Sequence, residues 1–176
     1  MTEEVLAQLI QDHARFPTAL LNLFQGAPLE LLRDRENEGR WSPLEILAHL
    51  RDEEQIDFRE RARACIEGRE FELNVDPERW VTEKRYNEMD PGAVYMDFAA
   101  ERADSCRWLE MLTPADLEAP AKNEKWKGMR AGDFIAAWRV HDLLHLRQFS
   151  QAMAVILARR YEGWNAGYAG TIPGAG

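Results

Sequence analysis

The stretch WSPLEILAHLRDEE, residues 41–54, marks a helix start more clearly than any other part of the chain. Ser42 is a favourable N-cap residue, and Pro43 suits the first helical turn because its missing N–H would be unpaired there anyway. Glu45 stands three residues after Ser42, which is the spacing of a capping box. We therefore predict a long helix over residues 42–66.

Apolar residues recur at helical spacing in three further segments on either side of this stretch, at 2–25, 91–112 and 131–161. A shorter helical piece is expected at 28–35. Pro17 is expected to kink or locally break the first segment, because proline cannot supply the N–H of an interior turn. Four long helices without a convincing pair of strands predict an all-α four-helix bundle.

The helical period is lost between residues 69 and 90, the longest irregular connection. The five residues FELNV, 71–75, alternate in polarity and are consistent with a short extended piece. Long connections inside compact domains are often functional. This one contains Arg85, Tyr86 and Asn87, whose polar side chains are candidate substrate-binding groups, with a plain surface loop as the alternative.

The domain organisation follows from length and glycine content. A chain of 176 residues has the size of one domain. We expect a bundle domain over residues 1–161. The remaining tail, residues 162–176, holds five of the 11 glycines, and we expect it to be loose or to lie on a partner surface.

Composition and charge exclude several classes of protein. The formal net charge of -9 has the wrong sign for neutralising nucleic-acid phosphates. No stretch without a charged residue is longer than 14 residues, so no membrane span is expected. The start MTEEV lacks the features of a secretory signal, and Cys65 and Cys106 show no CxxC spacing. We expect a cytoplasmic protein without a nucleic-acid or membrane partner.

Three of the four histidines fall on helix faces that are otherwise apolar. His141 and His145 lie one turn apart on the stripe that includes Trp138, and an i,i+4 histidine pair can close on one metal ion. His49, on the helix predicted over 42–66, can face the same interior. In helix bundles, facing helices supply metal ligands in this way. The pattern predicts a three-histidine site.

Burial gives the physical reason for a metal at these histidines. An unpaired buried polar group costs roughly 1 to 3 kcal/mol, and a divalent cation takes up one lone pair from each ring. Glu53, one turn from His49, is a candidate for orienting that ring or for acting as a general base. Three ligands leave coordination positions open, which is typical of a catalytic site. A hydrogen-bonded histidine cluster without metal remains the alternative.

Three neighbouring features bear on the interpretation of this site. HDLLH is not the HExxH motif of zinc proteases, because its second residue is Asp142 and lies about 100° around the helix from the histidine stripe. His13 is a candidate fourth ligand, although we favour a surface position near Pro17. Trp138 is expected to belong to the core beside the site.

Residues 41–54, followed about 90 residues later by VHDLLHLRQF, residues 140–149, resemble the DinB/YfiT-like superfamily of metal-binding four-helix bundles. The resemblance covers roughly residues 6–158. It implies that His49, His141 and His145 bind one divalent ion, zinc or nickel. It also implies an up-down-down-up helix order with a long connection between the second and third helices.

The resemblance also implies a range of activities. Members of the family include thiol S-transferases that use bacillithiol, mycothiol or glutathione, a maleylpyruvate isomerase in the wider group, and proteins described as metal-dependent hydrolases. We therefore expect a metal-dependent transferase or hydrolase acting on a small molecule, with a low-molecular-weight thiol as a candidate co-substrate. A non-catalytic, stress-associated metal-binding bundle is the alternative. Bundles of this size often pair, so a homodimer is expected.

Overall fold

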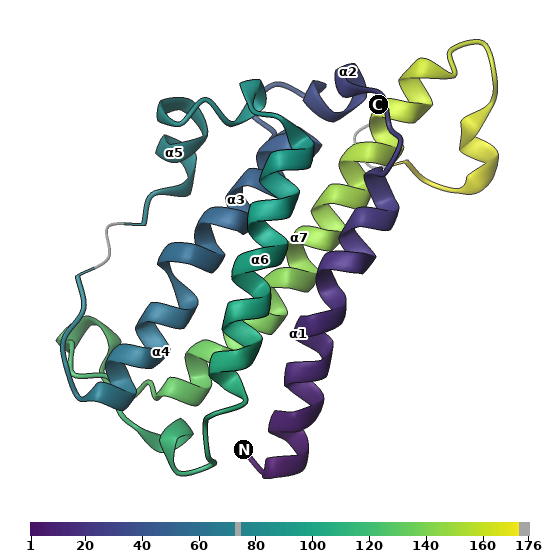
Figure 1. The fold of residues 1–176 in the computed structure, drawn as a ribbon. Helices are drawn as coiled ribbons and strands as arrows, with labels where there is room; N and C mark the ends of the chain where they lie inside the picture. Colours follow the sequence, from purple (N-terminus) through teal and green to yellow (C-terminus); the bar gives the residue numbers. More distant parts are fainter. Residues whose placement is uncertain (73–74, 173–176) are drawn as a thin grey trace.

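The computed structural model describes residues 1–72 and 75–172 and shows four long helical rods packed side by side (Figure 1). The rods are α1 (Glu3–Phe24), α3 (Pro43–Ile56) continued by α4 (Phe58–Glu67), α6 (Pro91–Leu109) and α7 (Ala131–Arg160). The short helix α2 (Leu29–Arg33) lies between the first two rods. Within the described residues, strand-like pairing is limited to an isolated bridge between Pro120 and Arg130. The predicted four-helix bundle is confirmed.

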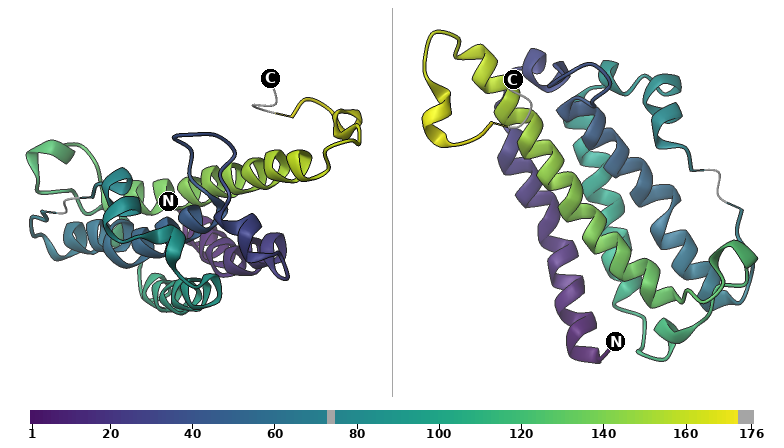
Figure 2. Two further views of the ribbon diagram at one scale, coloured as in Figure 1. Left: turned by 90° about the horizontal axis from the view of Figure 1, so that it is seen from above. Right: turned by 180° about the vertical axis from the view of Figure 1, so that it is seen from behind.

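The rods run up, down, down and up, as Figure 1 and the right view of Figure 2 show. α6 runs parallel to α3, so the chain must return along the whole bundle between them. This return contains α5 (Pro77–Glu83) and a 3-10 helix (Tyr86–Glu88), which the lost helical period did not predict. Both are too short for a period to be recognised. Two residues of the expected extended piece, 73 and 74, lie outside the described residues.

The start of α3 has the predicted capping box. The backbone N–H of Glu45 donates to Ser42 Oγ at 3.1 Å, and the Ser42 N–H donates to Glu45 Oε2 at 2.7 Å. The single helix predicted over 42–66 is wrong, because Asp57 interrupts it with φ -105° and ψ -89°. The apolar spacing continues across this break, so the sequence pattern does not reveal it. The redirected chain places the Phe58 ring parallel to Trp138, with ring centroids 6.1 Å apart.

Helix α1 continues through Pro17 without a break, which corrects one of the two outcomes expected for this proline. The remaining rods bury apolar side chains against α1 in two clusters. One cluster surrounds α3 and α6, and the other surrounds α4 and the first turns of α7. Representative buried members are Phe16, Leu20, Ile46, Phe98 and Phe149 in the first, and Leu6, Cys65, Leu109, Phe134 and Ile135 in the second.

After α7 the chain leaves the bundle in a loop that contains a 3-10 helix, Ala166–Ala169 (Figure 1). Trp164 and Tyr168 in this loop are almost fully exposed. In the described part of the chain, every helix is too short or too polar to cross a bilayer.

Candidate metal centre

Two rods bring three histidines together about halfway along the bundle. His49 comes from α3, and His141 and His145 come from α7, where they are one turn apart. The Nε2 atom of His49 lies 3.2 Å from His141 Nε2 and 3.1 Å from His145 Nε2. His49 is buried and the other two are partly buried. We call these three residues the histidine centre.

The spacing of the three nitrogens fits a shared metal ion. Tetrahedral coordination at the usual zinc–nitrogen bond length places two ligand nitrogens about 3.3 Å apart. A hydrogen-bonded cluster explains the geometry less well, because one ring nitrogen carries either a proton or a lone pair. His49 Nε2 can therefore satisfy only one of the two nitrogens that it faces, whereas a cation accepts all three lone pairs. The histidine centre fits a divalent metal.

Electrostatics keeps the imidazoles neutral, which is the form that binds metal. Burial, followed by the neighbouring His145 and His141 rings, lowers the pKa of His49 from an ordinary value of 6.5 to about 2. Burial and then His145 lower the pKa of His141 to about 3. The pKa of His145 is lowered as well, mainly by burial. Because the bundle removes these rings from water, protons compete poorly with a metal ion for the ring nitrogens.

The other ring nitrogens show how the histidines are oriented. His145 Nδ1 lies 2.8 Å from Gln148 Oε1, which can only accept, so Nδ1 is the protonated nitrogen and Nε2 carries the lone pair. Gln148 was part of the apolar-facing stripe in the sequence, but its role as a hydrogen-bond acceptor was not foreseen. His49 Nδ1 lies 3.8 Å from Glu53 Oε1. At that distance His49 Nδ1 is not hydrogen-bonded, so among the described residues only His145 has the paired second nitrogen that is usual for metal ligands.

Glu53 was a candidate general base as well as a candidate for orienting His49. Its carboxyl group lies on the Nδ1 side of His49, whereas the metal position lies on the Nε2 side. Burial, followed by the charge of Asp57 and a hydrogen bond with it, raises the pKa of Glu53 to about 8. A carboxyl group that is protonated near neutral pH is a poor base. The geometry therefore favours the orienting role.

The histidine centre opens to solvent beside His145. A surface pocket of about 220 Å³ is lined by His145 and Gln148 from α7, Gly39, Arg40 and Trp41 from the segment before α3, and Glu78 from α5. We call this pocket the cleft. The Trp41 ring lies parallel to His145 with centroids 6.2 Å apart, and its Nε1 donates to Glu78 Oε2 at 3.2 Å. The sequence did not single out Arg40, Trp41 or Glu78 as site residues.

The structure does not bring the predicted substrate-binding residues into the cleft. Arg85 is exposed, adopts a left-handed backbone with φ 54°, and pairs with Glu88. Tyr86 is fully buried, and its hydroxyl donates to Asp52 Oδ2 at 2.6 Å. Asn87 Oδ1 accepts from Ser42 Oγ at 2.7 Å, beside the α3 cap. Tyr86 and Asn87 thus hold the return segment against α3, whereas Arg85 does not. The sequence alone does not reveal these contacts.

The position expected for His13 is wrong. His13 is 0% exposed, and its ring centroid lies 5.0 Å from that of Trp138. It contacts Arg102 and Asp142 instead of the other histidines. Trp138 is buried, as expected, and Asp142 points away from the metal position, as its 100° offset predicted.

Comparisons with known proteins agree with this architecture. The model of the DinB superfamily matches residues 12–149. The structure is similar to that of YfiT from Bacillus subtilis, described as a probable metal-dependent hydrolase with an unusual four-helix bundle topology. The TM-score is 0.77 at 17% sequence identity, covering 93% of this chain and 91% of that one. No curated protein matches the sequence.

Proposed function

The chain belongs to the DinB superfamily, and on that premise we propose that it is a metal-dependent enzyme that transfers a low-molecular-weight thiol or hydrolyses a small substrate. His49, His141 and His145 hold one zinc or nickel ion. The thiol S-transferase is our first choice of reaction, and hydrolysis by an activated water is the second. The protein acts as a homodimer on a small molecule that enters through the cleft.

The observation that carries this proposal is the convergence of three histidines beside an open cleft: His49 Nε2 lies 3.2 and 3.1 Å from the Nε2 atoms of the other two, and all three ligand atoms lie within 4.8 Å of one another. Three protein ligands leave at least one coordination position, and the cleft reaches the centre at His145. A structural site closed by a fourth protein ligand lacks this access. His13 and Glu53, the two candidates for a fourth ligand, both lie away from the Nε2 atoms.

The metal would supply Lewis-acid chemistry, lowering the pKa of a bound thiol or water so that a nucleophile exists near neutral pH. The protein side chains provide the surroundings. Gln148 holds the His145 ring by its Nδ1–H, and the Trp41 ring lies parallel to it in the wall of the cleft. Arg40 and Glu78 at the cleft rim offer one positive and one negative group for the polar parts of a substrate.

Metal content tests the first part of the proposal. Purified untagged protein and a His141→Ala variant are analysed for zinc and nickel, and each is titrated with both ions after chelation. We expect about one ion per chain in the wild type and none in the variant. A Cys106→Ala variant is the matched control, since Cys106 is buried in α6 away from the centre and should leave the metal content unchanged.

Activity tests the second part. The metal-loaded protein is assayed with bacillithiol, mycothiol and glutathione against a common electrophile, and separately with small ester and amide substrates. Thiol conjugation that disappears in His141→Ala supports the transferase, and hydrolysis without thiol supports the second choice. Stoichiometric metal with neither activity would favour a non-catalytic metal-binding protein. A wild type that binds no metal would overturn the proposal.

A further inference from the structure

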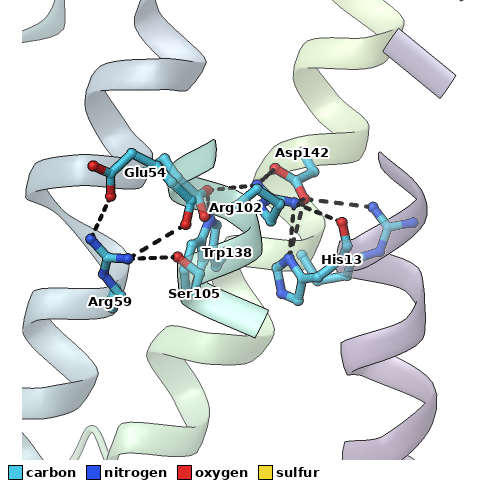
Figure 3. A network of polar contacts seen from close by, with 9 residues as sticks. His13, Glu54, Arg59, Arg102, Ser105, Trp138 and Asp142 are labelled. Atoms are coloured by element: carbon cyan, nitrogen blue, oxygen red, sulfur yellow. Dashed lines mark hydrogen bonds and ion pairs between the residues drawn. The ribbon is translucent and has the colours of Figure 1, made fainter. Parts of the chain in front are cut away.

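A second buried polar cluster lies one helix face away from the histidine centre (Figure 3). It contains Arg102 from α6, Asp142 and Trp138 from α7, Glu54 from α3 and His13 from α1. All five side chains are buried. We call this group the Arg102 cluster. It thus joins all four rods of the bundle, and the metal chemistry proposed above does not use it.

One guanidinium group makes the connections within this cluster. Its Nη1 and Nη2 donate to Asp142 Oδ2 and Oδ1 at 2.8 and 2.9 Å, in the two-pronged geometry that only arginine offers. Nη2 also lies 2.7 Å from Glu54 Oε2, and the Trp138 Nε1–H donates to the same oxygen at 3.1 Å. A lysine ammonium would replace this planar fork by one point charge.

Arg102 also completes the proline turn of α1. Pro17 has no N–H, so the His13 carbonyl four residues earlier lacks the usual helical donor. Arg102 Nη1 lies 3.4 Å from this carbonyl oxygen and 3.1 Å from His13 Nδ1. The guanidinium carbon is 5.1–5.4 Å from the ring centroids of Phe16, Phe98 and Trp138, so its position is defined on several sides.

The partners of Arg102 lie where they control the histidine centre. Asp142 directly follows His141, so its side chain leaves α7 about 100° around the axis from that ligand. Glu54 comes five residues after His49, which corresponds to about 140° around α3. Holding Asp142 and Glu54 against α6 therefore fixes the rotation of α7 and α3 about their axes, and with it the directions in which His141 and His49 point.

A metal site is sensitive to such rotations. Functional side chains must be held within about 0.5 Å and 10–20° of their working geometry. The two nitrogen–nitrogen separations at His49 are already 3.1 and 3.2 Å, so a small rotation of either helix would move one nitrogen out of range. An anchor on a neighbouring face of both helices is placed to prevent this.

From these contacts we infer that Arg102 is a positioning residue for the histidine centre: it sets the rotation of α3 and α7 by binding Glu54 and Asp142. This inference rests on the proposed function, because it assigns Arg102 to the same metal site. It adds a residue from α6, a rod that contributes no member of the histidine centre. A cluster that served only stability would leave the metal geometry unchanged when weakened.

The test compares Arg102→Met and Arg102→Lys with Leu109→Ala, a control in the core of the same helix where Leu109 is fully buried. Cobalt(II) is the probe, because its visible absorption reports ligand geometry. Each variant is titrated at a temperature where circular dichroism shows it to be folded. We expect Arg102→Met to weaken cobalt binding roughly tenfold to 100-fold and to shift the absorption bands. Arg102→Lys should fall between Arg102→Met and the wild type.

Leu109→Ala should lower the thermal midpoint and leave the cobalt affinity and bands unchanged. Wild-type bands and affinity in the folded Arg102 variants would overturn the inference, as would an equal effect of Leu109→Ala. If Arg102→Met does not fold, Arg102→Lys and Glu54→Gln take its place, because both retain polar partners in the cluster.

Metal-free protein separates this inference from the proposed function. The ring nitrogen chemical shifts of His49, His141 and His145 are measured by nuclear magnetic resonance. If the wild type binds no metal, the proposed function fails, yet Arg102→Lys should still change these shifts while Leu109→Ala does not. Shifts that stay the same in Arg102→Lys would overturn the positioning role in that case as well.

Discussion

The histidine centre and the Arg102 cluster share α7 through two consecutive residues, His141 and Asp142, and both remove polar groups from water. In the Arg102 cluster, a positive guanidinium meets carboxylates within hydrogen-bonding distance. In the histidine centre, three neutral rings present lone pairs to one another. The first contains its own positive charge, whereas the second gains a positive charge only from a cation. Burial of polar groups therefore has a structural use in one cluster and a ligand-binding use in the other.

The pKa directions express the same contrast. Burial opposes ionisation of Asp142, but the charge of Arg102 and the hydrogen bonds from His13 and Arg102 together outweigh burial and lower the pKa of Asp142 to about 2. Around Arg102, burial likewise lowers the pKa, and the charges of Asp142 and Glu54 outweigh it and raise the pKa overall. In the histidine centre burial is the largest effect on all three rings and lowers their pKa values, and the charge of Asp142, which raises the pKa of His141 and His145, does not outweigh it.

The largest expected effect on stability comes from removing the guanidinium group of the Arg102 cluster. Arg102→Met leaves two buried carboxylates without their cation, and removing one partner of a buried ion pair costs about 3 to 5 kcal/mol. We expect the free energy of unfolding, measured in urea, to fall by that amount. Arg85→Met removes a guanidinium from an exposed pair and serves as the control. A loss below that of the control would contradict the assignment of the cluster as a structural anchor.

Metal binding at the histidine centre should raise the free energy of unfolding. A ligand that binds only the folded state, at a free concentration 100 times its dissociation constant, raises the free energy of unfolding by about 2.7 kcal/mol. We expect zinc or nickel to do so for the wild type and to leave His141→Ala unchanged in chelated and metal-supplemented buffers. Equal stabilisation of both proteins would place the metal elsewhere.

The hydrogen bond between Gln148 and His145 can be tested by itself. Gln148→Leu removes the acceptor of the His145 Nδ1–H, and loss of such a partner weakens metal binding roughly tenfold to 100-fold. A competition titration against a chromophoric chelator measures the change. Gln148→Glu keeps an acceptor at the same distance and should bind at least as tightly as the wild type. If both variants bind alike, the bond does not orient His145.

The pH dependence of stability tests the neutral state of the histidine centre. The unfolded chain protonates its histidines below pH 6.5, whereas folded His49 and His141 stay neutral down to about 2 and 3. The stability of metal-free protein should therefore fall as the pH drops from 6.5 toward 3, by up to ~1.4 kcal/mol per pH unit for each ring. Urea unfolding between pH 7 and 4 measures this slope. His141→Leu should flatten it, and an unchanged slope would refute the neutral-ring assignment.

Glu53 contributes with the opposite sign over a neighbouring range. Its folded-state pKa of about 8 lies above the ordinary 4.5, so its contribution to stability is complete below pH 4.5 and is lost as the pH rises through 8. A Glu53→Gln variant should remove this second slope without changing the first. The same unfolding series, extended to pH 9, separates the two.

The smallest expected effect concerns Arg85, which the sequence placed among the substrate-binding candidates. Its left-handed backbone favours glycine, and its partner Glu88 is exposed. Arg85→Gly should change the free energy of unfolding by less than about 1 kcal/mol and leave metal affinity and activity unchanged. A marked loss of activity in this variant would show that Arg85 belongs to the functional site.

Much of the fold was accessible from the sequence because its signals are local. Ser42, Pro43 and Glu45 define a helix start within four residues, and helical spacing marks the rods. The break at Asp57 could not be predicted, because the apolar period continues through it. Helix α5 and the 3-10 helix after it could not be predicted either, because so few residues show no measurable period.

The sequence by itself determined the helical rods and the inward faces that carry His49, His141 and His145, because helical periodicity assigns each residue to a face. It did not determine how the polar residues on those faces pair. Only the tertiary structure decided that Tyr86 and Asn87 hold the return segment, that His13 is buried, and that Arg102 meets Asp142 and Glu54. These contacts join helices up to 89 residues apart in sequence, as for Arg102 and His13, and the packing angles that create them are set by the whole core rather than by neighbours in the chain.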